Sequence, residues 1–339
     1  VNEVNEMNEV NEVNEINEVN NEVLNMNNYL DKYYNNNNRC IIYYSNLCYE
    51  YLFQRPQQIM RFLDNKYNKI FIGVIKDIKY EEKYNVLVIP FKYRFKLIEY
   101  LNKKNSNKNN IIYYSNPKLY NEIIKINYIK LFDLLDAPIE EFKSWKENLD
   151  KCVECSKYVI YSHPELLNYL IDINKNKDYY YISNAVDYEH FKESKNRIGK
   201  RPILIKETDK PILGYYGAFS SWLDYNKIKE YADDGKYHIV MIGGIRSIPK
   251  YNIRIEHPNI TWINHVSYEK LPYYLSWFDK CFIPFKDSKL IRCVNPCKLW
   301  EYSVSKKEII KYNVNMPKIE KIITYKEVCY KLENIIDNK

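Results

Sequence analysis

The feature that most constrains the fold is a regular alternation, from residue 39 onward, of short apolar runs with longer stretches whose apolar residues recur every three or four positions. In the first half of the chain the apolar runs predict strands at 40–44, 70–75, 85–89, 111–114, 128–132, 158–161 and 179–182. Proline suits the first turn of a helix, and three prolines predict helices at 56–63, 138–155 and 164–171. Strands that alternate with helices form βαβ units around a parallel sheet, so the sequence predicts an α/β protein.

A polar, lysine-rich interval at 193–210 interrupts this alternation, and the apolar run at 211–217 resumes it. The second half predicts strands at 238–242, 259–263, 280–284 and 308–311, and helices at 225–233, 268–278 and 296–304. We therefore expect two doubly wound, Rossmann-like domains facing across a cleft, because such sheets bind ligands at the carboxyl ends of their strands. We divide the chain into a leader at 1–38, domains at 39–206 and 207–325, and a C-terminal helix at 326–339, whose apolar face must dock elsewhere, for example across the linker.

The first 22 residues repeat the triplet Val-Asn-Glu, with Met7 and Ile16 in place of valine. A period of three matches neither a strand nor an ideal helix, so this segment is expected to be disordered or loosely helical. It is either the product of repeat expansion or an arm that tethers the chain to a partner.

Charge is distributed unevenly along the chain. The net charge is +7, but the first thirty residues hold seven glutamates and no lysine or arginine, so the remainder carries 51 basic against 37 acidic side chains. A basic surface suits an anionic membrane, nucleic acid or phosphorylated substrates. Because the excess is spread out and no recognition motif is present, we expect no nucleic-acid partner and interpret most of the charge as a solvated face.

Several classes of protein are disfavoured by what the sequence lacks. It has no run of eighteen apolar residues and no signal peptide, so we expect a cytoplasmic protein, with peripheral contact at the inner face of the cell membrane as an extension that the basic charge allows. It also has no P-loop and no Gly-x-Gly-x-x-Gly motif, which argues against an ATPase and a dinucleotide dehydrogenase. The Gly-x-Ser-x-Gly motif of the nucleophile elbow is absent as well. No Asp-x-Asp pair follows a strand, so we expect no metal and no cofactor.

The eight cysteines are scattered through predicted core elements, which favours reduced thiols over disulfides. The alternative is a zinc site of Cys152, Cys155, Cys293 and Cys297. Both pairs fall in or beside helical patterns without Gly-rich knuckles, so reduced thiols remain the favoured interpretation.

The stretch Asn-Pro-Cys-Lys-Leu-Trp-Glu-Tyr at 295–302 begins a predicted helix directly behind an apolar run. A helix N-terminus offers unpaired N–H groups and a partial positive charge. Pro296 suits the first turn, Lys298 can ion-pair a phosphate, and Glu301 can accept a hydrogen bond from a hydroxyl. The stretch is therefore either a site for an anionic ligand that also carries hydroxyls, or a surface helix whose charges face water.

Glycines follow two of the second-half strands, although the chain has only seven glycines. Gly217 ends the run at 212–216, and Gly243 with Gly244 follows the strand predicted at 238–242. A missing side chain lets a pyrophosphate approach the backbone, and it also permits a simple tight turn.

Polar residues follow strands of the first half as well. Asp133 and Asp136 follow the strand at 128–132 and could orient a reacting hydroxyl, although for Asp136 we favour a helix cap. Arg55 could hold an acceptor phosphate or only pack beside the cleft. Asn184 lies in a turn after a strand, where it contacts an acceptor or shapes the loop.

Several motifs in a fixed order resemble bacterial glycosyltransferases of the two-Rossmann-domain GT-B class, specifically family 4-like enzymes of cell-surface polysaccharide synthesis. The resemblance spans about 40–336 and is carried by Gln-Arg-Pro-Gln-Gln at 54–58, Phe-Asp at 132–133 with Asp136, Tyr-Val-Ile-Tyr-Ser at 158–162, Asn-Ala-Val-Asp at 184–187 with Phe191, Gly-Tyr-Tyr-Gly-Ala-Phe at 214–219 with Trp222 and Asp224, and Pro-x-Lys-Leu-x-Glu-Tyr at 296–302.

The resemblance implies a nucleotide-sugar as co-substrate and a glycan or lipid-linked acceptor. By it, Gly217 faces the donor diphosphate, Lys298 lies near that diphosphate, Glu301 binds the donor ribose, and transfer retains the anomeric configuration. The departing nucleoside diphosphate gains charge, which Lys298 and the helix start would stabilise.

Two departures from the family pattern lie close to this site. Cys293 stands where the full pattern has a second glutamate, and Lys-Lys-Glu at 306–308 replaces Gly-Lys-Pro. A non-catalytic GT-B relative that binds nucleotide or glycan is therefore the alternative.

Overall fold

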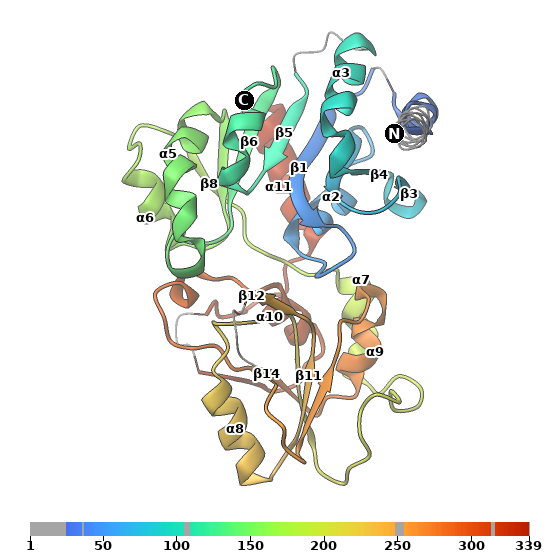
Figure 1. Ribbon diagram of the computed structural model, residues 1–339, viewed down its shortest axis with the longest axis vertical. Helices are drawn as coiled ribbons and strands as arrows, with labels where there is room; N and C mark the ends of the chain where they lie inside the picture. The colour runs from blue at the N-terminus through green and yellow to red at the C-terminus, as the bar shows by residue number, and fades with distance from the viewer. Residues whose placement is uncertain (1–24, 36, 105–108, 248–253, 313–315, 339) are drawn as a thin grey trace, which may run out of the picture.

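The computed structural model describes residues 25–338 except 36, 105–108, 248–253 and 313–315. The chain forms two lobes, drawn one above the other in Figure 1, and each is built on its own parallel sheet. None of the helices in the described residues is long and apolar enough to cross a membrane.

The first lobe contains an eight-stranded sheet in the order β3-β4-β2-β1-β5-β6-β7-β8, parallel except for β3 at its edge. Its strands are β1 (Cys40–Cys48), β2 (Asn68–Val74), β3 (Lys79–Glu81), β4 (Val86–Pro90), β5 (Ile111–Tyr114), β6 (Ile129–Leu134), β7 (Tyr158–Tyr161) and β8 (Tyr179–Tyr181). Alternate residues of β1 enter different cores, Ile42 and Tyr44 on one face and Ile41 and Tyr43 on the other. Both faces are therefore buried, as expected of a parallel sheet.

Helices cover both faces of this sheet: α2 (Arg55–Phe62), α3 (Arg94–Lys104), α4 (Tyr120–Ile123), α5 (Lys146–Cys155) and α6 (Leu166–Ile171). The helix predicted at 138–155 is shorter than expected, because its first turns form the 3-10 helix Glu140–Trp145 and α5 follows. Residues 25–33, assigned above to the leader, are helical and bury Met26 and Leu30 in the first lobe. The triplet repeat lies outside the described residues.

The second lobe contains a five-stranded parallel sheet in the order β13-β11-β9-β14-β15. These strands are β9 (Ile212–Tyr216), β11 (His238–Ile242), β13 (Ile260–Ile263), β14 (Lys280–Ile283) and β15 (Ile309–Lys311), and β10 (Phe219–Ser220) pairs with β12 (Ile245–Ser247) beside them. The helices are α7 (Tyr188–Phe191), α8 (Tyr225–Asp234), α9 (Leu271–Ser276) and α10 (Cys297–Val304). The helix predicted at 268–278 ends early, at Ser276, and begins with the 3-10 turn Tyr268–Lys270.

The last helix, α11 (Tyr325–Asp337), returns to the first lobe and packs on α2 (Figure 1). It buries Val328, Leu332 and Ile336 with Ile59 and Met60 of α2. The two chain crossings between the lobes also pair, through Val186 N–H with Ile323 O at 3.1 Å and Tyr325 N–H with Val186 O at 3.2 Å. The C-terminal helix thus completes the N-terminal lobe.

Candidate functional site

A cleft of about 210 Å³ lies between the lobes, lined by residues from both. The residues from the first lobe include Phe53, Asp136 and Asn184, and those from the second include Gly217, Gly243, Pro296, Lys298 and Glu301. Most of the polar residues singled out from the sequence therefore meet at this cleft.

Lys298 extends its side chain over Gly217 at the end of β9. A Cβ atom at Gly217 would lie 2.8 Å from Lys298 Cε and 3.0 Å from its Nζ, and Gly217 has a φ of +141°. The ammonium lies 5.2 Å from the ring centroid of Tyr215 and 5.1 Å from that of Phe285. Burial lowers the pKa of Lys298. Among the described residues no carboxylate forms an ion pair with it, so this cation is available to an anion in the cleft.

Gly243 lies against Gly217 at the same edge of the sheet. A Cβ atom there would come within 1.9 Å of the carbonyl oxygen of Gly217, and the φ of Gly243 is +152°. A larger residue at Gly243 would push apart the ends of β9 and β11, so this glycine is required by close backbone approach. The floor of the cleft beside Lys298 is consequently formed by bare backbone.

Pro296 is the N-cap of α10, with ψ of +130°, whereas the sequence placed it in the first turn. This shift by one position leaves the hydrogen bonding of the helix start unchanged, because proline has no N–H to donate at either position. The first N–H groups of α10 remain without intrahelical partners, as in every helix. They begin at Cys297, beside Lys298.

Glu301 lies one turn further along α10 and is 6% exposed. The hydroxyl of Tyr216 donates to its Oε2 at 2.7 Å. Burial raises the pKa of Glu301 to about 7, against the opposing effects of the Tyr216 hydrogen bond and of Lys298. Near neutral pH this carboxyl can therefore either accept or donate a hydrogen bond.

Asp133 is not a catalytic residue, contrary to the sequence-based assignment. It is fully buried and does not line the cleft. Arg55 Nε donates to its Oδ2 at 2.8 Å, and the Tyr113 hydroxyl donates to the same oxygen at 2.7 Å. A carboxylate held in this way cannot reach a substrate, and its charge neutralises Arg55.

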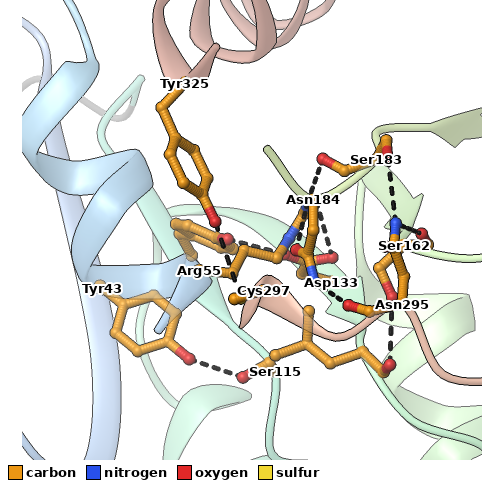
Figure 2. A network of polar contacts seen from close by, with 12 residues as sticks. Tyr43, Arg55, Ser115, Asp133, Ser162, Ser183, Asn184, Asn295, Cys297 and Tyr325 are labelled. Atoms are coloured by element: carbon orange, nitrogen blue, oxygen red, sulfur yellow. Dashed lines mark hydrogen bonds and ion pairs between the residues drawn. The ribbon is translucent and has the colours of Figure 1, made fainter. Parts of the chain in front are cut away.

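Arg55 is likewise held by the protein (Figure 2). It is 2% exposed, and its Nη1 also donates to Ser183 O at 2.7 Å and to Asn184 Oδ1 at 3.3 Å. Arg55 lines the cleft, but its guanidinium already has partners within the chain, which favours the packing role over the binding of an acceptor phosphate.

Asp136 lines the cleft and does not cap a helix, since Ile139 is the N-cap of the following 3-10 helix and Trp145 that of α5. Asn184 is 7% exposed and donates through Nδ2 to the carbonyl oxygen of Asn295 in the second lobe. It therefore shapes the joint between the lobes at the edge of the cleft.

Aromatic contacts between the lobes lie at the cleft, and they were not predicted from the sequence. Phe53 stacks on Tyr268 with ring centroids 4.7 Å apart, and Gln58 Nε2 donates to the Tyr268 hydroxyl at 2.5 Å. Tyr51 lies against His265 with centroids 4.6 Å apart. The signal was the apolar run Tyr-Leu-Phe at 51–53, which lies between β1 and α2 and belongs to neither element.

Cys293 is buried in the core of the first lobe and does not line the cleft. Its thiol donates to Lys289 O at 3.5 Å, and burial raises its pKa to about 11.

Among the described residues no three His, Cys, Asp or Glu side chains gather as metal ligands, so the zinc alternative is wrong. At residues 306–308, where the sequence departs from the family pattern Gly-Lys-Pro, Lys306 adopts a φ of +56°. This is the left-handed conformation that glycine favours.

No protein-family model matches the chain. Over 144 residues it is 25% identical to a Bacillus subtilis (strain 168) protein assigned as the teichuronic acid biosynthesis glycosyltransferase TuaH, and the match covers 42% of this chain. The chain thus spans only 35% of the length of that relative.

Solved structures resemble the chain over most of its length. Sucrose-phosphate synthase of Thermosynechococcus elongatus superposes with a TM-score of 0.57 at 13% identity, covering 80% of each chain. Anabaena HepE in complex with UDP-glucose gives 0.56 at 12% identity, covering 88% of this chain and 89% of HepE. The E. coli trehalose-6-phosphate protein bound with UDP-2-fluoro glucose gives 0.56 at 10% identity, covering 87% and 90%. These likenesses confirm the predicted GT-B fold.

Proposed function

We propose that this chain, with its GT-B fold, is a glycosyltransferase that moves a sugar from a nucleotide-sugar donor to a glycan or lipid-linked acceptor in surface polysaccharide synthesis. One observation carries the proposal: Lys298, without a carboxylate partner among the described residues, lies over the bare backbone of Gly217 at the start of α10. HepE, whose structure contains UDP-glucose, shares the fold, and TuaH is named for teichuronic acid biosynthesis.

The geometry supports a role for each residue at the donor side. Lys298 and the N–H groups at the start of α10 stabilise the charge that develops on the departing nucleoside diphosphate. Gly217 and Gly243 let the diphosphate approach the backbone, and Pro296 leaves the helix start open. Glu301 hydrogen-bonds the donor ribose.

Asp136 is the candidate for orienting the acceptor hydroxyl, because it is the carboxylate that the first lobe contributes to the cleft lining among the described residues. Asn184 also lines the cleft from the first lobe and would supply a second polar contact at the acceptor side. We also propose that transfer retains configuration, as the family resemblance implies, and that it is independent of metal, since no Asp-x-Asp pair follows a strand. A lipid-linked acceptor would bring the basic protein to the inner face of the membrane, which the net positive charge favours.

A thermal-shift screen against UDP-, GDP-, CMP- and dTDP-sugars tests the donor site, because a ligand that binds only the folded state raises the melting temperature. We expect one nucleotide to stabilise the protein and Glu301→Ala to remove that shift while the protein stays folded. Glu230→Ala, at an exposed position of α8, is the matched control and should keep the shift. An unchanged shift in Glu301→Ala would show that the donor lies elsewhere.

The second candidate function is nucleotide or glycan binding without turnover. It is favoured by Cys293, which replaces the second family glutamate and does not line the cleft. Calorimetry paired with a donor-hydrolysis assay separates the two functions. Nucleotide binding without release of nucleoside diphosphate, with any acceptor, would favour the binding function.

A further inference from the structure

The buried joint between the lobes is centred on Asn295, which has no assigned role in donor or acceptor binding. Asn295 is 3% exposed and immediately precedes Pro296, the N-cap of α10. Its side chain reaches the first lobe, while its own backbone belongs to the turn that carries Lys298. Figure 2 shows this arrangement, with Asn295 between Ser162, Ser183 and Asn184.

The carboxamide of Asn295 has partners on both sides. Its Nδ2 donates to Ser162 O at 3.0 Å and to Ser183 Oγ at 2.9 Å, both in the first lobe. Its Oδ1 accepts from the indole Nε1 of Trp300 in α10 at 2.8 Å. An indole N–H can only donate and a backbone carbonyl can only accept, so the orientation of this amide is fixed by its neighbours.

The backbone of Asn295 is held as well, because Asn184 Nδ2 donates to its carbonyl oxygen. Asn184 in turn accepts from Arg55, which is ion-paired with Asp133. The start of α10 is therefore connected through buried hydrogen bonds to the ends of three first-lobe strands: β6 through Asp133, β7 through Ser162, and β8 through Ser183 and Asn184.

From these contacts we propose that Asn295 is a positioning residue that sets the start of α10, and with it Lys298, relative to the acceptor side of the cleft. This inference rests on the proposed function, since it concerns how donor and acceptor are brought together. The donor contacts named above lie within the second lobe and do not require the joint. Transfer requires that the two lobes hold donor and acceptor in the correct relative position. A displacement of the reacting groups by about 1 Å can lower the rate by about 100-fold.

The test compares Asn295→Ala with Asn110→Ala. Asn110 is also a fully buried asparagine, but it precedes β5 at the opposite edge of the sheet, where its Oδ1 accepts from Cys40 N. With UDP and UDP-glucose as probes, we expect Asn295→Ala to keep the dissociation constant of UDP within about twofold and to lower turnover at least about tenfold. Asn110→Ala should lower the melting temperature and change neither quantity.

Hydrogen exchange without nucleotide tests the joint independently of the proposed function. In Asn295→Ala the backbone amides of residues 160–165 and 183–187 should exchange faster than in the parent, and in Asn110→Ala they should not. Equal losses of UDP affinity and turnover, or unchanged exchange in both segments, would refute the positioning role. If the parent binds neither UDP nor UDP-glucose, the proposed donor fails and exchange alone decides on the joint.

A milder variant covers the case in which Asn295→Ala does not fold. Ser183→Ala removes one of the two acceptors of Asn295 Nδ2 and leaves the Trp300 contact in place. It should give the same pattern with a smaller loss of turnover. Unchanged turnover together with unchanged exchange in this folded variant would also refute the role.

Discussion

Replacing Gly217 by alanine should weaken nucleotide binding through Lys298, a residue far from it in sequence. The new Cβ would lie 2.8 Å from Lys298 Cε, at a backbone φ of +141°. The strain of that conformation costs about 1–3 kcal/mol of folding free energy. Relief of the clash moves the lysine away from its place over Gly217.

The expected loss of affinity follows from the interaction that moves. A hydrogen bond to a charged group contributes about 1.5–3 kcal/mol, so the dissociation constant of UDP should rise by about 10- to 150-fold. Isothermal titration calorimetry of the folded variant with UDP measures this change. The double variant with Lys298→Ala should lose less affinity than the sum of the two single losses, since both changes act on the contact of Lys298 with the phosphate.

Gly199 provides the matched control. Its φ is +58°, and a Cβ there would meet nothing within 4 Å. Gly199→Ala should therefore lose about 1–2 kcal/mol of folding free energy from the left-handed conformation and leave UDP affinity unchanged. If folded Gly217→Ala binds UDP within about twofold of the parent, the placement of the phosphate beside Lys298 is wrong.

Three further predictions concern stability. Lys306→Gly should raise the free energy of unfolding by about 0.5–1 kcal/mol, because Lys306 adopts a φ of +56° at the end of α10; chemical denaturation measures it, and a loss of stability would contradict the argument. Glu301 has its pKa raised from 4.5 to about 7, so its contribution to stability is present below pH 4.5 and is lost as the pH rises through 7. The free energy of unfolding of Glu301→Gln minus that of the parent should therefore increase by up to about 3 kcal/mol between pH 4.5 and pH 8. A difference that does not change with pH would refute this sign. Asp133→Asn should cost about 3–5 kcal/mol of unfolding free energy, because it leaves the buried guanidinium of Arg55 without its counterion; a loss below about 1 kcal/mol in denaturant titration would show that another group neutralises Arg55.

The sequence predicts the elements that carry the donor side of the cleft because their signals are local. The strand β9, the glycine at its end and the helix after Pro296 are each marked by an apolar run or by a residue with a special backbone preference. Parallel strand ends meet at one edge of a sheet, so Gly217, Lys298 and Glu301 could be placed near one another before any coordinates were known.

The errors arose where the partner of a residue is distant in sequence. Asp133 follows a strand as a catalytic carboxylate would, and only the folded chain shows that Arg55, 78 residues away, neutralises it. The contact of Phe53 with Tyr268 depends likewise on how the two lobes meet. Helix starts were also misplaced, because the 3-10 turn Glu140–Trp145 and α5 share one continuous sequence pattern.

The return of α11 to the first lobe has a consequence for synthesis of the protein. Ile59 and Met60 of α2 share a buried core with Leu332 and Ile336 of α11, which follow them in the chain only after the whole second lobe. A nascent chain that has released α2 but not yet α11 still exposes this apolar strip to solvent and to chaperones. The first lobe, although its strands precede those of the second lobe in the chain, is therefore completed only after α11 has been synthesised.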